Sequence, residues 1–235
     1  MEEGPSADVP LIGVLALQGD FEAHGQVLRR LGATVREVRI PADLENLAGL
    51  VIPGGESTTM TLGIEREGLA EPLRKLAGRD RKGNLAGGTG TDGMGLGGIP
   101  ILGSCAGLIM LDREHLGIMD ILAERNAFGR QLRSFEADVE IKIPPALGIP
   151  PGPPVRGVFI RAPWIAEHGP DVEILAQVDG HAVAARQGRV VAVAFHTELG
   201  LDDRLHRLLL ADVAANGASS PADSSVDESS VGEAG

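Results

Sequence analysis

The only cysteine of the chain lies in a pattern that could make it a nucleophile. Cys105 is the centre of Gly103-Ser104-Cys105-Ala106-Gly107, between an apolar run, Ile99–Leu102, and a helical stretch. A tight strand-to-helix turn of this kind lifts the nucleophile above a sheet, and its glycines avoid collisions with neighbouring backbone. Backbone N–H groups at the helix start would favour a thiolate and a developing oxyanion. The alternative is a buried cysteine in a glycine-rich turn.

A hydrolase that uses a thiolate nucleophile needs a general base. His196 ends the apolar run Arg189–Phe195 and is followed by Thr197-Glu198. Residues two apart in an extended chain face the same side, so the Glu198 carboxylate can orient the imidazole of His196. A solvated strand end is the alternative for this pair taken alone.

The other histidines show no such pairing. His24 lies on a predicted helix and has no visible acid partner at catalytic spacing. We expect three more histidines at the surface: His115, His168 and His206. One cysteine and scattered histidines do not make a ligand set, so no metal site is expected, and no cofactor either.

Two glycine-rich segments have different predicted roles. Pro53-Gly54-Gly55-Glu56-Ser57 lies between a short strand and a helix, where its N–H groups could face an oxyanion. Gly78–Gly98 holds nine glycines in 21 residues and predicts a flexible loop. That loop lacks the Gly-Lys-Ser/Thr ending of a phosphate-binding loop.

The elements that must position these residues alternate along the first half of the chain. Apolar runs bounded by turn residues predict strands, and apolar residues at helical spacing predict helices between them. The predicted strands are Leu11–Leu17, Thr34–Ile40, Leu50–Pro53 and Ile99–Gly103, and the predicted helices are Phe21–Leu31, Ser57–Ala77 and Ala106–Asp112. This alternation indicates an α/β fold with a mostly parallel central sheet covered on both faces.

The second half predicts an antiparallel extension of that sheet. Apolar and polar residues alternate over Val139–Ile143, as in a half-exposed strand, and six prolines over Pro144–Pro154 predict a loop. Asp179-Gly180 and Gln187-Gly188 favour hairpins. The further predicted strands are Val155–Ile160, Val172–Val178, His181–Arg186 and Arg189–Phe195, and Leu201–Ala215 is the final helix.

Composition limits the class of protein. The chain has 235 residues and a net charge of -12, which argues against nucleic acid or an anionic membrane surface as a partner. No apolar run reaches the roughly 18 residues of a membrane span, and Met1–Pro10 does not resemble a signal peptide. We expect a soluble cytoplasmic protein with a disordered N-terminus (1–10), one domain (11–217) and a disordered acidic, serine-rich tail (218–235).

The three candidate segments together resemble class I (triad) glutamine amidotransferases, which have a flavodoxin-like three-layer fold. Further motifs narrow the resemblance to the glutaminase subunits of pyridoxal 5'-phosphate synthase, and it extends in order over about Leu11–Asn216. The segments that carry it are Leu15–Gly19, Pro53–Met60, Gly103–Ile109, Glu124–Gln131, Ser134–Glu136 and Phe159–Pro163.

The resemblance implies a role for individual residues. Cys105 matches the nucleophile, His196 the base and Glu198 the orienting acid of a thioester mechanism that hydrolyses L-glutamine to L-glutamate and ammonia. Gly55 and Ala106 match the donors to the oxyanion. The residues that match glutamine contacts are Gly54, Gly55, Glu56, Arg125, Ile160 and Arg161.

The resemblance also implies a partner. A synthase subunit would accept the ammonia to build pyridoxal 5'-phosphate (vitamin B6) from a pentose phosphate and a triose phosphate. Gln18 matches a residue near the contact with that subunit, and such glutaminases are poorly active until docked.

Three departures from the family pattern stand out. Thr197 replaces the usual proline between the histidine and the glutamate, Ser104 replaces the usual threonine before the cysteine, and Gly78–Gly98 exceeds the usual short connection. Two alternatives stay open: another triad amidotransferase or a γ-glutamyl hydrolase, and a non-catalytic redox or chaperone protein with an elbow cysteine.

Overall fold

The computed structural model describes residues 9–79, 98–125, 134–200 and 202–218. The predictions made for residues 1–8, for most of Gly78–Gly98 and for the tail 219–235 lie outside these ranges. The matched segment Glu124–Gln131 is described only at its first two residues.

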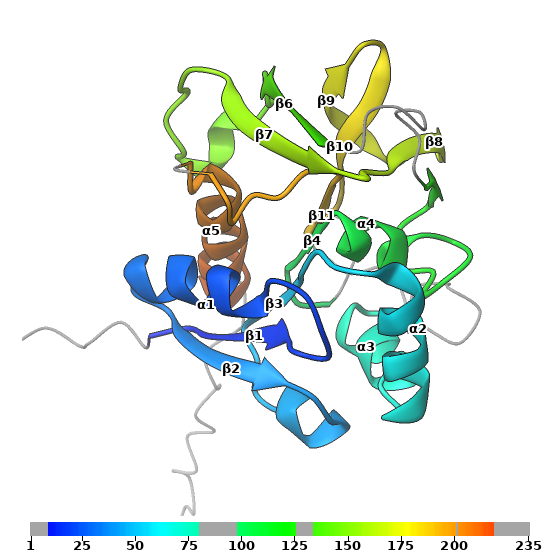
Figure 1. Ribbon diagram of the computed structural model, residues 1–235. Helices are drawn as coiled ribbons and strands as arrows, with labels where there is room; N and C mark the ends of the chain where they lie inside the picture. The colour runs from blue at the N-terminus through cyan, green and yellow to red at the C-terminus, as the bar shows by residue number, and fades with distance from the viewer. Residues whose placement is uncertain (1–8, 80–97, 126–133, 201, 219–235) are drawn as a thin grey trace, which may run out of the picture.

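The centre of the fold is a parallel sheet (Figure 1), and the first half of the chain supplies four of its strands, as predicted. Its strands occur in the spatial order β2-β1-β3-β4-β11, and each pairs in parallel with its neighbour. Their bounds are β1 Leu11–Leu15, β2 Thr34–Val38, β3 Gly49–Ile52, β4 Ile101–Ser104 and β11 Val190–Val193. The fifth, β11, comes from the run Arg189–Phe195, which was predicted only as part of the antiparallel extension. The carboxyl ends of β3, β4 and β11 meet at one edge, so the residues that follow them come together there.

Antiparallel strands continue this sheet in the order β11-β10-β8-β5, and β9 pairs with the side of β10. The bounds are β5 Ile121–Glu124, β8 Trp164–His168, β9 Glu173–Val178 and β10 His181–Gln187. The predicted Asp179-Gly180 turn joins β9 to β10, and both residues have the positive φ of a tight hairpin turn. Strands β6 (Ser134–Val139) and β7 (Val155–Ile160) form a separate antiparallel pair.

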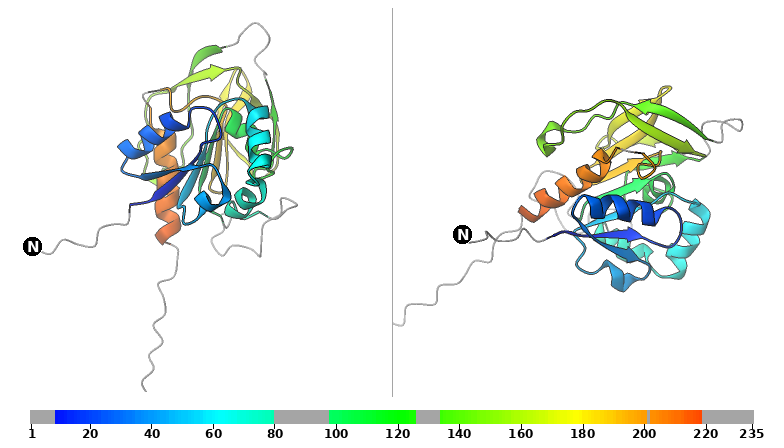
Figure 2. Two further views of the ribbon diagram at one scale, coloured as in Figure 1. Left: turned by 60° about the horizontal axis from the view of Figure 1, so that its bottom comes forward. Right: turned by 60° about the vertical axis from the view of Figure 1, so that its left-hand side comes forward.

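Helices cover both faces of the sheet (Figure 2). On one face lie α1 (Phe21–Arg30) and α5 (Arg204–Ala218). On the other lie α2 (Ser57–Arg66), α3 (Ala70–Leu76) and α4 (Ala106–Leu111). The predicted three-layer α/β architecture is therefore confirmed. Within the described residues, no helix is both long and apolar enough to cross a membrane.

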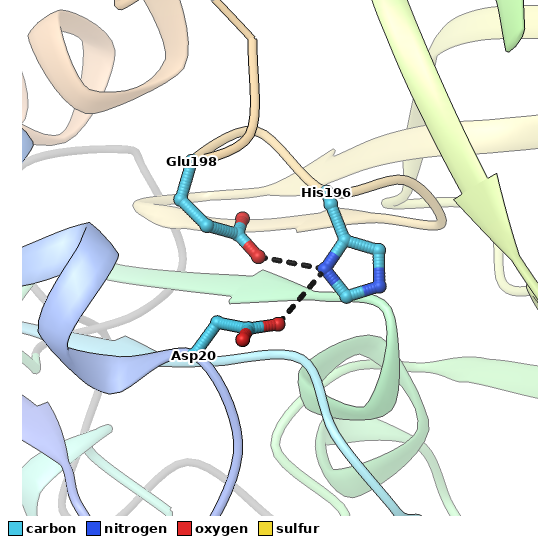
Figure 3. A group of neighbouring side chains, drawn as sticks. All are labelled: Asp20, His196 and Glu198. Atoms are coloured by element: carbon cyan, nitrogen blue, oxygen red, sulfur yellow. Dashed lines mark hydrogen bonds and ion pairs between the residues drawn. The ribbon is translucent and has the colours of Figure 1, made fainter.

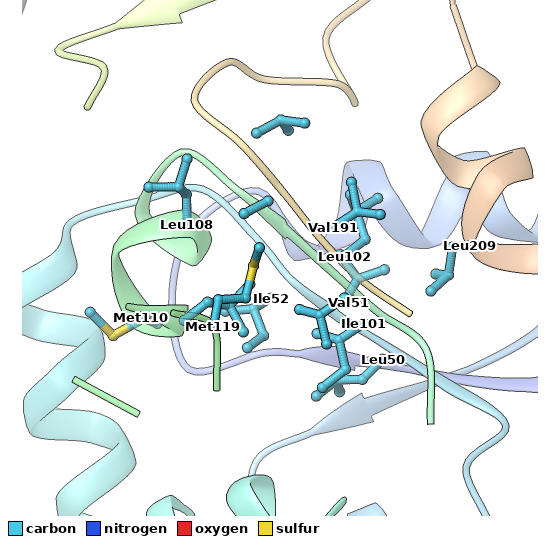
Figure 4. Packing of buried hydrophobic residues seen from close by; sticks show 14 of the residues in the cluster. Leu50, Val51, Ile52, Ile101, Leu102, Leu108, Met110, Met119, Val191 and Leu209 are labelled. Carbon is cyan, nitrogen blue, oxygen red and sulfur yellow. The ribbon is translucent and has the colours of Figure 1, made fainter. Parts of the chain in front are cut away.

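The core lies between the parallel sheet and these helices (Figure 4). Strands β3, β4 and β11 are buried along their whole length, which explains their continuous apolar sequences. Leu50 and Ile52 of β3, Ile101 of β4 and Leu108 of α4 are all fully buried members of this core. The strand ends that carry the candidate site residues therefore start from a rigidly packed layer.

Two element predictions are wrong. The strand predicted over Val139–Ile143 ends at Val139, which pairs with Val155, the first residue of β7. The residues before Val155 are rich in proline, which has no N–H group to donate, so the pairing stops there. The helix predicted over Ser57–Ala77 is broken into α2 and α3 at Gly68, whose φ of 67° is not helical. Strands β5 and β8 were not predicted.

Candidate active site

Cys105 lies in a strained turn between β4 and α4. Its φ of 49° and ψ of -104° are unusual for a residue other than glycine. Its N–H donates to the Val193 carbonyl, 2.8 Å away, so β11 holds the turn in place. A Cβ atom built on Gly103 would lie 2.9 Å from the carbonyl carbon of Gly107. The two glycines of the motif therefore face each other at a distance that no larger residue allows, and the predicted elbow is confirmed in its geometry.

His196 and Glu198 follow β11 and face each other, as their spacing predicts. Nδ1 of His196 donates to Oε1 of Glu198 across 2.6 Å, and both side chains are buried (Figure 3). The backbone N–H of His196 donates to the Val158 carbonyl of β7 at 2.9 Å. Because Nδ1 is engaged with Glu198, Nε2 of His196 is the ring nitrogen left to act as a base.

The environment of the pair favours the charged form of both side chains. Burial disfavours an imidazolium, but hydrogen bonds with Cys105 and Glu198 outweigh it and raise the pKa of His196 to about 10. Burial likewise opposes ionisation of Glu198, yet the hydrogen bond from His196, together with the nearby His24 ring, holds the pKa of its carboxyl below the ordinary value. An imidazolium beside Cys105 is the arrangement that stabilises a thiolate.

Asp20 is a second acid beside the same ring nitrogen. Its Oδ2 lies 3.5 Å from Nδ1 of His196, and its side chain is half exposed (Figure 3). Asp20, His196 and Glu198 are also the one group of three potential metal ligands among the described residues. The short His196–Glu198 hydrogen bond accounts for the ring nitrogen without a cation. Asp20 is not among the predicted site residues, although it lies just before the first predicted helix.

The Gly54-Gly55 turn packs directly against the catalytic candidates. A Cβ atom on Gly54 would lie 2.5 Å from Cε1 of His196 and 3.4 Å from Cβ of Cys105. The side-chain amide of Gln18 holds the next peptide: it donates to the Glu56 carbonyl at 3.0 Å and accepts from the Glu56 N–H at 3.1 Å. A side chain on Gly55 would strike this amide.

Glu56 has a structural task that no sequence pattern predicted. Its carboxylate accepts hydrogen bonds from the N–H groups of Thr58 and Thr59 and so caps the start of α2. These bonds lower the pKa of Glu56 to about 2. The carboxylate is therefore ionised and already bound to the helix end.

A pocket of about 400 Å³ joins the segments together. Eight of the predicted residues line it: Gly55, Glu56, Cys105, Ala106, Arg125, Ile160, Arg161 and His196. Arg161 has a φ of 46°, a second strained backbone position at the pocket. Arg125 and Arg161 are both exposed, so their guanidinium groups are free to face a bound anion. The tertiary structure thus brings most of the sequence-predicted residues to one pocket, while Gln18, Gly54 and Glu198 lie outside its lining.

Two predictions about histidines are wrong. His24 does have an acid partner, because its Nε2 lies 3.1 Å from Oε2 of Glu198. His206 is fully buried rather than exposed, with Nε2 at 2.9 Å from Nδ1 of His24. A signal was present in the sequence: His24 precedes Val27 and Leu28 by three and four residues, so it lies on the buried stripe of its helix.

Comparison with known proteins identifies the family. The model of the SNO glutamine amidotransferase family matches residues 14–215. The chain is a member of this family. It is 48% identical over 206 residues to the pyridoxal 5'-phosphate synthase subunit PdxT of Pelotomaculum thermopropionicum, covering 85% of this chain and 93% of that protein. It is 45% identical to the protein of the same name from Streptomyces avermitilis, covering 89% and 96%.

Solved structures agree with membership of the SNO family. A crystal structure of a glutamine amidotransferase matches with a TM-score of 0.70 and 39% identity, covering 86% of this chain and 98% of that one. A putative GMP synthase component from Thermoplasma acidophilum matches with a TM-score of 0.66 at 15% identity, covering 91% and 98%, which shows a shared fold alone.

Proposed function

We propose that this SNO-family chain is the glutaminase subunit of a pyridoxal 5'-phosphate synthase, with Cys105, His196 and Glu198 as its catalytic triad. The observation that carries the proposal is the 2.6 Å bond from a buried Glu198 to His196, which lines the same pocket as Cys105. Relatives that are 48% and 45% identical to it carry this subunit name.

The reaction begins when the Cys105 thiolate attacks the side-chain amide carbon of L-glutamine. The N–H groups of Gly55 and Ala106 are the proposed donors to the tetrahedral oxyanion. Nε2 of His196 then protonates the leaving ammonia, and a thioester to Cys105 remains. His196 next takes a proton from water, which attacks the thioester and releases L-glutamate. Glu198 stabilises the imidazolium throughout.

The pocket offers charges that suit a free amino acid. The α-carboxylate of glutamine is a partner for the guanidinium groups of Arg125 and Arg161, and a bidentate pair of this kind fixes orientation as well as affinity. The ammonium group is the proposed partner of Glu56. Both carboxylate oxygens of Glu56 already accept hydrogen bonds from the start of α2, and these bonds fix the carboxylate in place. A contact with the ammonium group of glutamine would be made in addition to them.

The ammonia passes to a partner synthase, with Gln18 near the contact, and we place the complex in the cytoplasm. Gln18 braces the Glu56 peptide next to Gly55, so a partner that touches Gln18 can reach the proposed oxyanion donor. This contact supplies a physical route by which docking raises activity.

Ammonia release from L-glutamine, measured with and without the partner synthase of the same organism, tests the proposal. We expect activity that rises with the partner and is lost in Cys105→Ala. Activity that survives this substitution, or its absence with the partner present, would overturn the enzyme assignment. Equal activity with and without the partner would instead favour another amidotransferase or a γ-glutamyl hydrolase.

A further inference from the structure

A buried chain of polar side chains continues behind the proposed triad. Oε2 of Glu198 lies 3.1 Å from Nε2 of His24, which is also 3.0 Å from Oγ of Ser104. On its other side, Nδ1 of His24 lies 2.9 Å from Nε2 of His206. His24, Ser104 and His206 are each 0% exposed. The chain therefore runs from α5 through α1 to the acid of the triad and to the residue that precedes the nucleophile.

The positions of the protons follow from the partners. A bare nitrogen at Nε2 of His24 would put its lone pair against the Glu198 carboxylate, so this atom carries the proton. Nδ1 of His24 is then an acceptor, and Nε2–H of His206 donates to it. Nδ1 of His206 becomes an acceptor with no partner among the described residues, which costs less than a buried N–H without one.

A neutral His206 agrees with this assignment. Burial lowers the pKa of His206 to about 3, so the ring stays neutral in ordinary conditions. In a neutral imidazole one nitrogen donates a hydrogen bond and the other accepts one. Among the described residues, the available acceptor for the N–H of His206 is Nδ1 of His24.

The proton on Nε2 of His24 is shared between two acceptors. Its hydrogen bond has good geometry toward Ser104, while Oε2 of Glu198 receives no well-aligned hydrogen bond from the described residues although His24 lies 3.1 Å away. A buried carboxylate oxygen without a hydrogen-bond donor is energetically costly. The N–H of His24, at this distance, therefore has a large effect on the position of the Glu198 carboxylate.

We propose that His24 is a positioning residue of the glutaminase site, and that His206 fixes the ring nitrogen on which His24 carries its proton. His24 orients Glu198, which in turn orients His196, and through Ser104 it also restrains the strand that enters the Cys105 elbow. His24 does not line the pocket, so it acts on glutamine only through these residues. The proposal rests on the triad assigned above.

Substitutions at position 24 distinguish the effect of the hydrogen-bond donor of His24 from the effect of its side-chain volume. His24→Gln keeps an N–H near the place of Nε2, whereas His24→Asn keeps one only near the place of Nδ1, and His24→Leu keeps none. We expect kcat to fall about tenfold to a hundredfold in the Leu and Asn variants and to recover in the Gln variant, as for residues that orient catalytic groups elsewhere. KM for glutamine should stay near that of the wild type.

The pH dependence of kcat/KM distinguishes a positioning role of His24 from a merely structural one, which would leave it unchanged. Loss of the donor to Glu198 should shift the acid limb of kcat/KM upward by about one pH unit, a tenfold change in proton affinity. His206→Leu should shift it in the same direction by less. The titratable groups near the chain, unchanged in all variants, are Asp20, Cys105, His196, Asp203 and Arg30.

Two measurements need neither glutamine nor the synthase. Cys105 is the only cysteine, so its rate of alkylation by iodoacetamide against pH reports its ionisation alone. Nitrogen NMR shifts of His196 report its tautomer at a pH above its pKa of about 10, where the ring is neutral. In His24→Leu and His24→Asn we expect a higher alkylation midpoint and loss of the fixed Nδ1–H tautomer, both restored in His24→Gln.

His168→Leu, on the exposed end of β8, is the matched control and should change none of these quantities. The inference is overturned if the variants fold, judged by thermal melts, and keep the wild-type alkylation midpoint and His196 tautomer. A lower melting temperature with an unchanged midpoint would also overturn it. If the wild type released no ammonia, the proposed function would fail while these two measurements still decided the role of His24.

Discussion

Gly54→Ala is the substitution for which the structure gives the sharpest expectation. An added Cβ atom would lie 2.5 Å from Cε1 and 3.0 Å from Nδ1 of His196. Ordinary contact between carbon atoms begins at about 3.5 Å, so the ring and the turn must separate by about 1 Å. The ring cannot simply rotate away, because its Nδ1 is held by Glu198 at 2.6 Å.

A displacement of this size has a predictable cost. Moving a catalytic group by about 1 Å lowers the rate on the order of a hundredfold, which corresponds to about 2.7 kcal/mol of activation free energy. Overpacking at Gly54 should also lower the free energy of unfolding by about 1–3 kcal/mol. The two effects are separable, because kcat can be measured well below the melting temperature.

Thermal melts, together with glutaminase assays in the presence of the synthase, measure both quantities. Gly217→Ala is the matched control, since a Cβ there meets no atom within 4 Å and lies on α5, where alanine is favoured. It should keep kcat and hold or raise the melting temperature. A Gly54→Ala protein with wild-type kcat would refute the placement of His196 against this turn, whatever its melting temperature.

Three further substitutions test the buried polar groups. The pKa of Glu198 in the folded protein is below its ordinary value of 4.5, so its ionised carboxylate stabilises the fold above pH 4.5, and this stabilisation is lost as the pH falls. In Glu198→Gln, the melting temperature should therefore decrease less steeply in acid. Asp212→Ala would leave Arg186, its buried partner at 2.7 Å, without a counter-charge and should cost about 3–5 kcal/mol in denaturant unfolding, with kcat of the folded enzyme unchanged. Thr197→Val removes a buried hydroxyl that has no partner among the described residues and should stabilise the fold by about 1 kcal/mol in the same assay; a loss of stability would show that the hydroxyl is satisfied.

Local sequence patterns were enough to predict most of the fold and the candidate triad. The buried runs that became β3, β4 and β11 are mostly apolar, and a candidate site residue follows each of them within three residues: Gly54, Cys105 and His196. Residues at the carboxyl ends of neighbouring parallel strands must meet, so Cys105 and His196 could be paired without coordinates. The spacing of His196 and Glu198 is likewise a local property of extended chain.

Other features depended on contacts that no local pattern encodes. The alternation over Val139–Ile143 is typical of a strand, but pairing requires a neighbouring chain with free N–H groups, and the prolines before β7 remove them. Strands β5 and β8 are likewise defined by pairing with each other across the end of the sheet. Whether such a segment becomes a strand is decided by its neighbour in space.

The histidines behind the triad show the same division most clearly. The sequence by itself determined that His24 lies on a helix, but its burial was not predicted, and 182 residues separate it from His206. Their contact exists because α1 and α5 pack on the same face of the sheet, where a buried polar atom is costly without a partner. Periodicity determined which elements form and which strand ends carry the chemistry. Only the packing of those elements decided which buried polar groups share a proton.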